Sequence, residues 1–277
     1  MLPRDMSRRR YEANLIELQE RMTAYARENG IEVADPAPDT VRLSHSLYLA
    51  HSTASDDFSK ICAAGRLLSA TQLALRGGKA SKPGSVKVLL GTADSVFFYV
   101  APFRYPNTGC GLLFARSLEE HRMDDGVATP FDSGGLVHVL VRPNPAEPVR
   151  DFLSRHELPI PDYREYLRIS LATLFDKPVD YIEGSQPRWS GPIGLMGGDR
   201  RRWTHEVRIP REVWIRTGDL QAVFAPISRV ASDPEIGRLF EWCKSEGRDR
   251  ISFNTARGDD FEALRRECVK YIYSKLQ

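Results

Sequence analysis

The sequence predicts a mixed α+β protein whose two ends are helical. Its 277 residues suffice for one large domain or two small ones with a substantial core. Apolar residues recur at helical spacing near both ends, whereas short strand-like runs are spaced irregularly between them. The chain contains neither an internal repeat nor a low-complexity tract. We therefore expect a single α+β domain with short strands.

The first elements are expected to be a helix at residues 7–29, a linker at residues 35–40 and a strand at residues 46–53. A second helix should end at Gly65, with Asp56 or Asp57 as its N-cap. The basic, glycine-containing stretch that follows is expected to be a flexible loop, at residues 76–87.

The rest of the chain alternates between strands, loops and helices. Strands are expected at residues 95–102, 111–117, 136–143, 205–210 and 220–225. Turn-rich loops are expected at residues 127–135 and 184–203. Helices are expected at residues 161–176, 233–246 and 259–276.

Composition excludes few function classes. A net charge of +2 does not by itself indicate a nucleic-acid-binding protein, and basic residues instead gather locally at 8–10, 200–202 and 265–266. The four cysteines are scattered, without the short spacing of a metal site, so we expect no metal. We identify no signal peptide and no apolar run of about 18 residues, so we expect a cytoplasmic protein without membrane association.

Several familiar motifs are absent from the sequence. No G-x-G-x-x-G follows a strand, and no G-x-S-x-G elbow occurs. The segment GGKAS would place the leading glycine of a phosphate-binding loop on Leu73, which excludes that loop. His205 and Glu206 lack the second histidine of H-E-x-x-H, so a metalloprotease is excluded as well.

Three separated segments remain as candidates for chemistry, at residues 50–70, 95–107 and 200–210. Each has an ordinary structural explanation when taken alone. A histidine at a strand end is commonly a structural residue, aromatic residues on a strand commonly belong to the core, and a glutamate at a strand start is commonly solvated. Their order and spacing along the chain instead indicate that the three segments form one set of functional motifs.

Together these segments resemble the motifs of the ADP-ribosyltransferase superfamily, in which three short motifs on separate strands line an NAD cleft. His51 with Thr53 corresponds to the first motif, Tyr99 to the second and Glu206 to the third. A loop at residues 184–203 leads directly into that glutamate. The resemblance implies a split β-sheet core with an NAD cleft, extended by N- and C-terminal helices.

Within that superfamily, the chain resembles the DarT-like branch, which ADP-ribosylates nucleic acid as the toxin of toxin–antitoxin and anti-phage systems. Residues 98–106, FYVAPFRYP, match that branch's FYF-x-P-R-S-P with one residue inserted before the arginine. The pattern H-x-T, helix, I-x-x-x-G-L is matched from His51 to Leu67 with one extra residue. A functional arginine of the branch has no clear counterpart, because the corresponding stretch offers Arg76, Lys79, Lys82 and Lys87.

The resemblance implies a role for each matched residue. Glu206 would be the catalytic carboxylate, because cleavage of the bond between ribose and nicotinamide builds positive charge on the sugar. His51 and Thr53 would hydrogen-bond the adenosine-side ribose, and Tyr99 would stack on the cationic nicotinamide. Arg104 suits the pyrophosphate of NAD.

The segment before Glu206 is expected to hold the substrate. Its tryptophans offer stacking faces for an unpaired base and its arginines neutralise phosphates. The residues assigned to this role are Trp189, Arg200, Arg201, Arg202 and Trp203. A mobile surface loop pinned by its tryptophans is the structural alternative.

The sequence thus predicts an NAD-dependent mono-ADP-ribosyltransferase that modifies DNA or RNA, as a bacterial toxin with an antitoxin or regulatory partner. A protein-targeting transferase and a non-catalytic nucleic-acid-binding module are the alternatives. We expect an N-terminal helix and linker at residues 1–40, a catalytic domain at 41–230 and a helical extension packed on it at 231–277.

Overall fold

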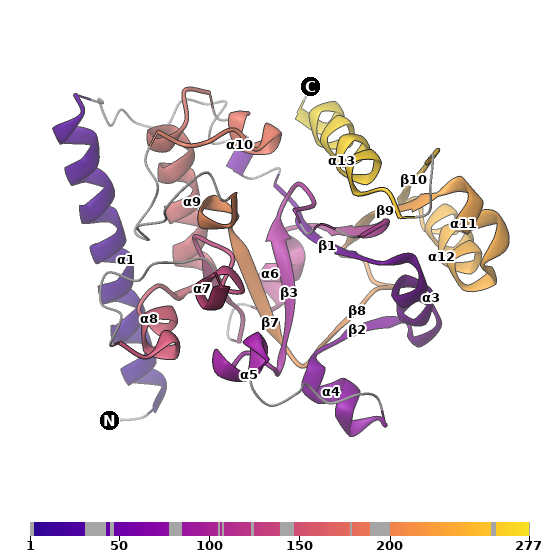
Figure 1. Ribbon diagram of the computed structural model, residues 1–277, viewed down its shortest axis with the longest axis horizontal. Coiled ribbons are helices and arrows are strands. Elements are labelled where there is room, and N and C mark those ends of the chain that lie inside the picture. Colours follow the sequence, from indigo (N-terminus) through magenta and orange to yellow (C-terminus); the bar gives the residue numbers. More distant parts are fainter. Residues whose placement is uncertain are drawn as a thin grey trace.

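The computed structural model describes most of the chain (Figure 1). The described residues are 3–30, 43–44, 47–77, 85–104, 106, 108–122, 125–138, 147–177, 179–188, 200–255 and 259–276, without the side chains of residues 3–11, 137, 138, 200 and 202. The expected linker at residues 35–40 lies outside them.

An eight-stranded, mostly antiparallel sheet forms the centre of the molecule, in the order β10-β9-β4-β1-β3-β7-β5-β6. Its strands are β1 (Leu49–Thr53), β3 (Ser95–Val100), β4 (Cys110–Phe114), β5 (Val127–Thr129), β6 (Leu158–Pro159), β7 (Glu206–Pro210), β9 (Leu220–Pro226) and β10 (Asp249–Phe253). A separate two-stranded sheet pairs β2 (Arg66–Leu68) with β8 (Glu212–Trp214). The α+β class is confirmed.

The sheet is split between β1 and β3. Strand β1 pairs with β4 along all five of its residues, from Leu49 to Thr53. It pairs with β3 only at Leu49 and Ala50, opposite Val100 and Tyr99. Beyond Ala50 the two strands separate, which opens the sheet on that side and gives the split core that the family resemblance implies.

Helices pack against the sheet, and the described part of the chain begins and ends with a helix. The described helices are α1 (Pro3–Glu28), α3 (Ser55–Ala64), α4 (Ala70–Leu75), α5 (Val86–Leu89), α6 (Ser117–His121), α7 (Gly135–His138), α8 (Val149–Ser154), α9 (Ile160–Leu174), α10 (Asp180–Glu183), η1 (Arg200–Trp203), α11 (Ile227–Ser232), α12 (Pro234–Ser245) and α13 (Phe261–Leu276). Figure 1 shows α1 alongside α9 at one end and α12 and α13 at the other. None of the helices described here has the length and apolar character needed to cross a membrane.

The expected helices and strands agree with the structure at most positions. The long helices α1, α9, α12 and α13 lie where periodicity predicts them, and Pro161 is in the first turn of α9. Gly65 ends α3 in the left-handed region, at φ 69°. The free thiols of Cys62 and Cys268 are buried, as their apolar surroundings predict.

Several expectations about local structure are wrong. Residues 127–129 form strand β5 inside the expected loop at residues 127–135, because they pair with β6 and β7. Residues 135–138 form helix α7 rather than the start of a strand at residues 136–143, of which residues 139–143 lie outside the described part. Ala54, not Asp56 or Asp57, is the N-cap of α3. The two aspartates lie in the first turn, where negative charge is favourable.

Strand β10 is a further difference, because the C-terminal extension was expected to contain only the helices at residues 233–246 and 259–276. Its residues alternate between half-buried and exposed side chains until Phe253. The strand forms by parallel pairing with β9, from Asp249 opposite Ala222 to Phe253 opposite Pro226. Its own sequence, DRISF, has only a weak apolar pattern, so the strand forms because it pairs with β9.

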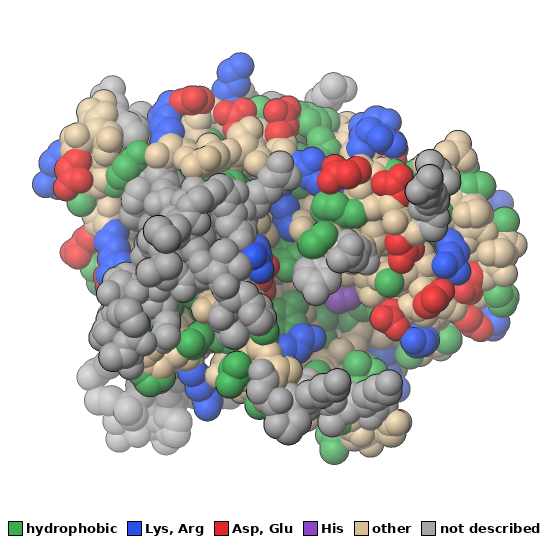
Figure 2. Space-filling model, in the orientation of Figure 1, with side chains coloured by type: hydrophobic (Ala, Val, Ile, Leu, Met, Phe, Trp, Pro, Cys, Tyr) green, Lys and Arg blue, Asp and Glu red, His purple; other side chains and the backbone are tan. Residues whose placement is uncertain are grey.

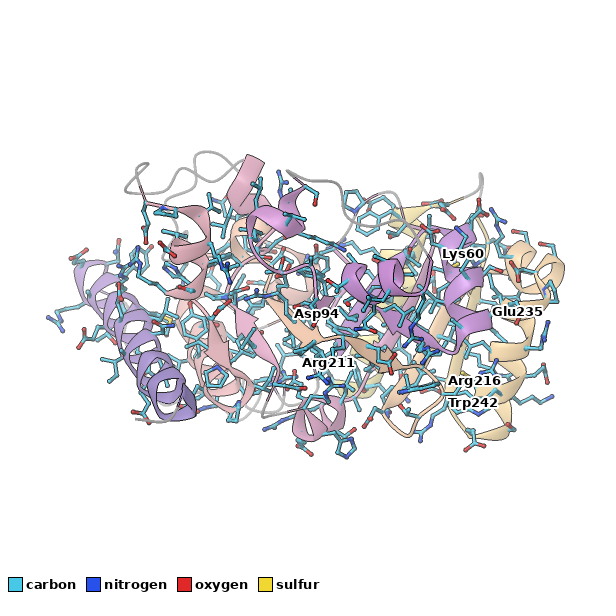
Figure 3. The ribbon with its side chains drawn as sticks, turned by 90° about the horizontal axis from the view of Figure 1, so that it is seen from below. Lys60, Asp94, Arg211, Arg216, Glu235 and Trp242 are labelled. Carbon is cyan, nitrogen blue, oxygen red and sulfur yellow. The ribbon has the colours of Figure 1, made fainter. Side chains whose placement is uncertain are left out.

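Backbone hydrogen bonds between turns fix the ends of β3 and β7 at which Asp94 and Arg211 lie; both residues are labelled in Figure 3. The backbone N–H of Arg211 donates to the carbonyl of Asp94 at 2.8 Å, and Ser69 N–H donates to the carbonyl of Arg211 at 2.8 Å. Arg211 has a φ of 69°. These bonds join the turn between β7 and β8 to the segments before β3 and α4.

A buried ion pair joins α6 to α9. Arg164 Nε donates to Glu119 Oε2 at 2.6 Å, and Arg164 Nη2 donates to Glu119 Oε1 at 2.5 Å. The same guanidinium also donates to the carbonyls of Ser44 and Leu47 at 3.2 and 3.3 Å. Both side chains are buried, so each charge depends on the other for compensation.

We expect Glu119→Ala to lower the free energy of unfolding by about 3–5 kcal/mol, because it leaves the Arg164 charge buried without its carboxylate. The matched control is Glu165→Ala, which removes the partner of the half-exposed Arg168 on the same helix and should cost about 0.5 kcal/mol or less. Urea unfolding of both variants measures the difference. Equal losses would contradict the importance of the buried pair.

Candidate active site in the split of the sheet

A cavity of about 810 Å³ occupies the split between β1 and β3. Figure 2 shows this face of the molecule hollowed near its centre. The walls come from β1, β3, the start of α5 and the residues after it, the turn before α7 and the start of β7. The polar and charged lining residues are His51, Ser52, Lys87, Thr92, Ser95, Tyr99, Arg104, Asp132, Ser133, Arg201 and Glu206.

Glu206 lies at the start of β7, with its side chain 2% exposed. It is opposite Tyr99 of β3 on one side and Thr129 of β5 on the other. Its Oε1 accepts a hydrogen bond of 2.6 Å from Ser133 Oγ, and Arg208 Nε lies 3.6 Å away. The sheet on both sides therefore fixes the glutamate backbone, while a serine orients its carboxylate.

Burial and, after it, the nearby Asp132 carboxylate raise the pKa of Glu206 to about 8. The charge of Arg208 and the hydrogen bond from Ser133 act in the opposite direction. Two buried carboxyl groups facing one cavity cannot both ionise cheaply, so the charge of each favours the protonated form of the other.

Asp132 is the second acid of the cavity, and a tight turn fixes it. Its Oδ1 accepts from Gly134 N–H at 2.8 Å and its Oδ2 accepts from the Tyr99 hydroxyl at 3.2 Å. Its own N–H donates to the Arg201 carbonyl at 2.9 Å. Burial raises the pKa of Asp132, against these hydrogen bonds and the charge of Arg201. The turn thus connects the second strand motif with the segment before Glu206.

His51 spans the split from β1 to β3. Its Nδ1 lies 2.9 Å from the Phe97 carbonyl, to which it donates. Burial lowers the pKa of His51, and the charge of Lys87 lowers it too. In the neutral ring Nε2 is therefore the acceptor nitrogen, suited to a ligand hydroxyl.

Lys87 brings a positive charge into the same cavity. Its Nζ lies 5.0 Å from the ring centroid of Phe97, which faces the split. Although part of the side chain is exposed, burial lowers the pKa of its ammonium group, whereas the Glu206 carboxylate raises it. Of the basic residues at 76–87, Arg76 is paired with Glu212 at 2.8 Å, and Lys79 and Lys82 lie outside the described residues.

The expected site residues fall into three groups. His51, Tyr99, Arg104, Arg201 and Glu206 all line the cavity. Two others do not: Thr53 lies half-buried at the end of β1, where Ser52 lines the cavity instead, and Trp203 is buried, 5% exposed. Trp189 and the side chains of Arg200 and Arg202 lie outside the described residues.

Sequence reasoning missed Asp132 and Ser133 as members of the site. The segment DSGG was recognised only as a turn, and nothing in its local pattern indicates that it faces Glu206. Their proximity depends on β5, whose pairing with β7 carries the following turn to the mouth of the split. An aspartate followed by a serine and a glycine pair was the available signal, and it indicates a tight turn rather than a site.

The raised pKa of Glu206 predicts a pH-dependent contribution to stability. Its protonated form is favoured in the folded state, so the contribution is fully present below about pH 4.5, the ordinary value, and is lost as pH rises through about 8. Glu206→Gln mimics the protonated form. We expect the Tm of Glu206→Gln to exceed that of the parent by several degrees at pH 9 and by much less at pH 5. A difference independent of pH would contradict the assignment.

No protein-family model and no curated protein matches this sequence. Solved structures do match, among them DarT from Thermus sp. 2.9. Its complex with ADP-ribosylated ssDNA has a TM-score of 0.40 and 13% identity, covering 74% of this chain and 93% of that one. Its complex with NAD+ has a TM-score of 0.40 and 15% identity, covering 74% and 94%. The carba-NAD+ complex has a TM-score of 0.39 and 14% identity, covering 75% and 95%. The chain is similar to these DarT structures.

Proposed function

We propose that this protein is an NAD-dependent mono-ADP-ribosyltransferase whose target is nucleic acid. The observation that carries the proposal is the convergence of three distant sequence motifs on one cavity. His51 of the first motif, Tyr99 of the second and Glu206 of the third all line the split of the sheet. A structural role for each residue alone would not require them to meet at a solvent-accessible cavity.

The cavity fits NAD in size and in chemistry. Its volume of about 810 Å³ lies within the range of about 300–1,000 Å³ that is typical of sites for small molecules and cofactors. His51 offers a ring nitrogen for a ribose hydroxyl, and Tyr99 offers an aromatic face for a flat cation. Arg104 and Lys87 supply positive charge for a pyrophosphate. When bound, NAD supplies a ribose carbon whose bond to nicotinamide can be cleaved.

Glu206 is the group we assign to catalysis. A buried carboxylate that lines the cavity stabilises positive charge that develops on a sugar, and does so more strongly than a solvated one because it lies in a low-dielectric environment. The cationic ligand in turn favours the ionised form of the glutamate, against the burial that raises its pKa. The hydrogen bond from Ser133 fixes the orientation of the Glu206 carboxylate, so this group does not have to reorganise during the reaction.

Nucleic acid is the target class that the surroundings of the cavity favour. Arg201 lines the cavity directly before Glu206, and Arg104 lines it from the segment after β3. With Arg104 assigned to the pyrophosphate of NAD, the guanidinium group of Arg201 suits the phosphates next to an acceptor base. A polypeptide acceptor has no comparable need for this charge.

The first test is nicotinamide release from NAD by the purified chain, with and without single-stranded DNA or RNA oligonucleotides. We expect release that rises with one nucleic acid and falls by about 100-fold or more in Glu206→Gln, because the neutral amide cannot stabilise the developing charge. Transfer of labelled ADP-ribose to the oligonucleotide identifies the product. Release that is equal in both proteins would contradict the role of Glu206, and label on polypeptide alone would favour the protein-targeting alternative.

We propose, in addition, that the activity makes the protein a bacterial toxin, as the motif resemblance implies. Expression of the parent chain in bacteria is then expected to arrest growth, whereas Glu206→Gln should be tolerated because it retains the fold and loses the charge. Colony counts after induction, normalised to protein level, measure the effect. Equal growth of the two cultures at equal protein levels would contradict a toxic activity.

A further inference from the structure

A second, smaller pocket of about 50 Å³ shares part of its wall with the large cavity. Arg104, Asp132 and Arg201 line both, so the two spaces adjoin. Thr204, Phe261 and Arg265 complete the smaller pocket. Phe261 and Arg265 belong to α13, the C-terminal helix, so this helix reaches the rim of the candidate site. Figure 1 shows α13 and α10 on the same side of the molecule.

Two of the three arginines are held by the end of α10. Arg104 Nη2 donates to the Tyr181 carbonyl, and Arg265 Nη2 donates to the Glu183 carbonyl. Gly184 follows with a φ of 80° and leaves room for both. A Cβ at this position would lie 2.5 Å from Arg104 Nη1 and 3.0 Å from Arg265 Nη2, so the two guanidinium groups converge over the glycine.

The pocket therefore concentrates positive charge. Its lining contains three guanidinium groups and one carboxyl group, that of Asp132. That carboxyl group is engaged by Gly134 N–H and the Tyr99 hydroxyl. Arg265 Nε is buried and has no hydrogen-bond partner within the described part of the chain. The backbone carbonyls of α10 hold Arg104 and Arg265 close together, and with Arg201 they give the pocket a positively charged lining that suits an anion.

We propose that this pocket binds a phosphodiester group of the strand that is modified, with Arg265 of the C-terminal helix as a substrate-binding residue. This inference rests on the proposed function and names the contact that the acceptor strand makes. The guanidinium groups of Arg201 and Arg265 match the acceptor oxygens of a phosphate, while Arg104, at the boundary of the two spaces, is the residue assigned to the pyrophosphate of NAD. The ring of Phe261 in the same wall gives a stacking face for an unpaired base.

The geometry favours a phosphate of the nucleic-acid strand, rather than of NAD, as the occupant of the small pocket. The large cavity has the volume to enclose NAD and contains Lys87 and Arg104 for its pyrophosphate. The small pocket adjoins it at Arg104, Asp132 and Arg201, and its wall includes Thr204, which precedes Glu206 by two residues. A strand bound there would lie next to the cavity that contains Glu206.

The test is oligonucleotide binding by the full chain in a Glu206→Gln background, measured by fluorescence anisotropy with labelled single-stranded DNA and RNA and without NAD. We expect Arg265→Gln to weaken the Kd for one of the two by about tenfold, and to lower the slope of log Kd against log salt by about 1. Arg266→Gln is the matched control, because Arg266 is the next residue on the same helix, is largely exposed and lies outside the pocket. It should bind as the background protein does.

The outcomes separate this inference from the proposed function, because binding requires no catalysis. Equal effects of Arg265→Gln and Arg266→Gln on the Kd would overturn the inference and indicate a diffuse basic surface. If neither oligonucleotide binds, the inference is overturned as well. A raised KM for NAD in an otherwise unaltered chain carrying Arg265→Gln, with oligonucleotide Kd unchanged, would assign the pocket to the pyrophosphate and overturn the inference. Arg265→Lys keeps the charge and controls for folding; it should retain most of the binding and the parent Tm.

Discussion

The short pairing between β1 and β3 is the constraint on which the rest of the site depends. After Ala50 the backbone of β1 continues to pair with β4 but no longer with β3. Buried backbone groups must still be satisfied, and the side chain of His51 donates to the Phe97 carbonyl across the opening. The same separation that requires this bond creates the cavity of about 810 Å³. One histidine therefore holds the split together and presents its other nitrogen to a ligand.

The two acids of the cavity, Glu206 and Asp132, affect the ionisation of each other. Glu206 and Asp132 are both buried, and each raises the cost of ionising the other. Ser133, Tyr99 and Gly134 satisfy their oxygens, which lets two acids remain in the core of the sheet. Such a pair costs stability but is suited to catalysis, because positive charge that develops on a ligand beside Glu206 favours its ionised form.

The C-terminal helix connects the edge of the sheet with this centre. Its buried face, which includes Leu264, Cys268 and Ile272, packs into the main core, while Arg265 lies at the smaller pocket. Arg104 and Arg265 approach each other because Gly184 has no side chain between them. The extension is therefore both part of the core and, through Arg265, part of the charged rim of the cavity.

The sequence by itself determined the long helices, most of the central strands and the segments that carry His51, Tyr99 and Glu206, because periodicity and short motifs are local properties of the chain. It could not determine β10, α7, or the roles of Asp132, Lys87 and Arg265. Strand β10 exists by pairing with β9, and the DSGG turn reaches Glu206 only because β5 pairs with β7. Tertiary structure alone decided which residues share the cavity, since the desolvation and proximity of side chains distant in sequence arise only when the sheet has formed.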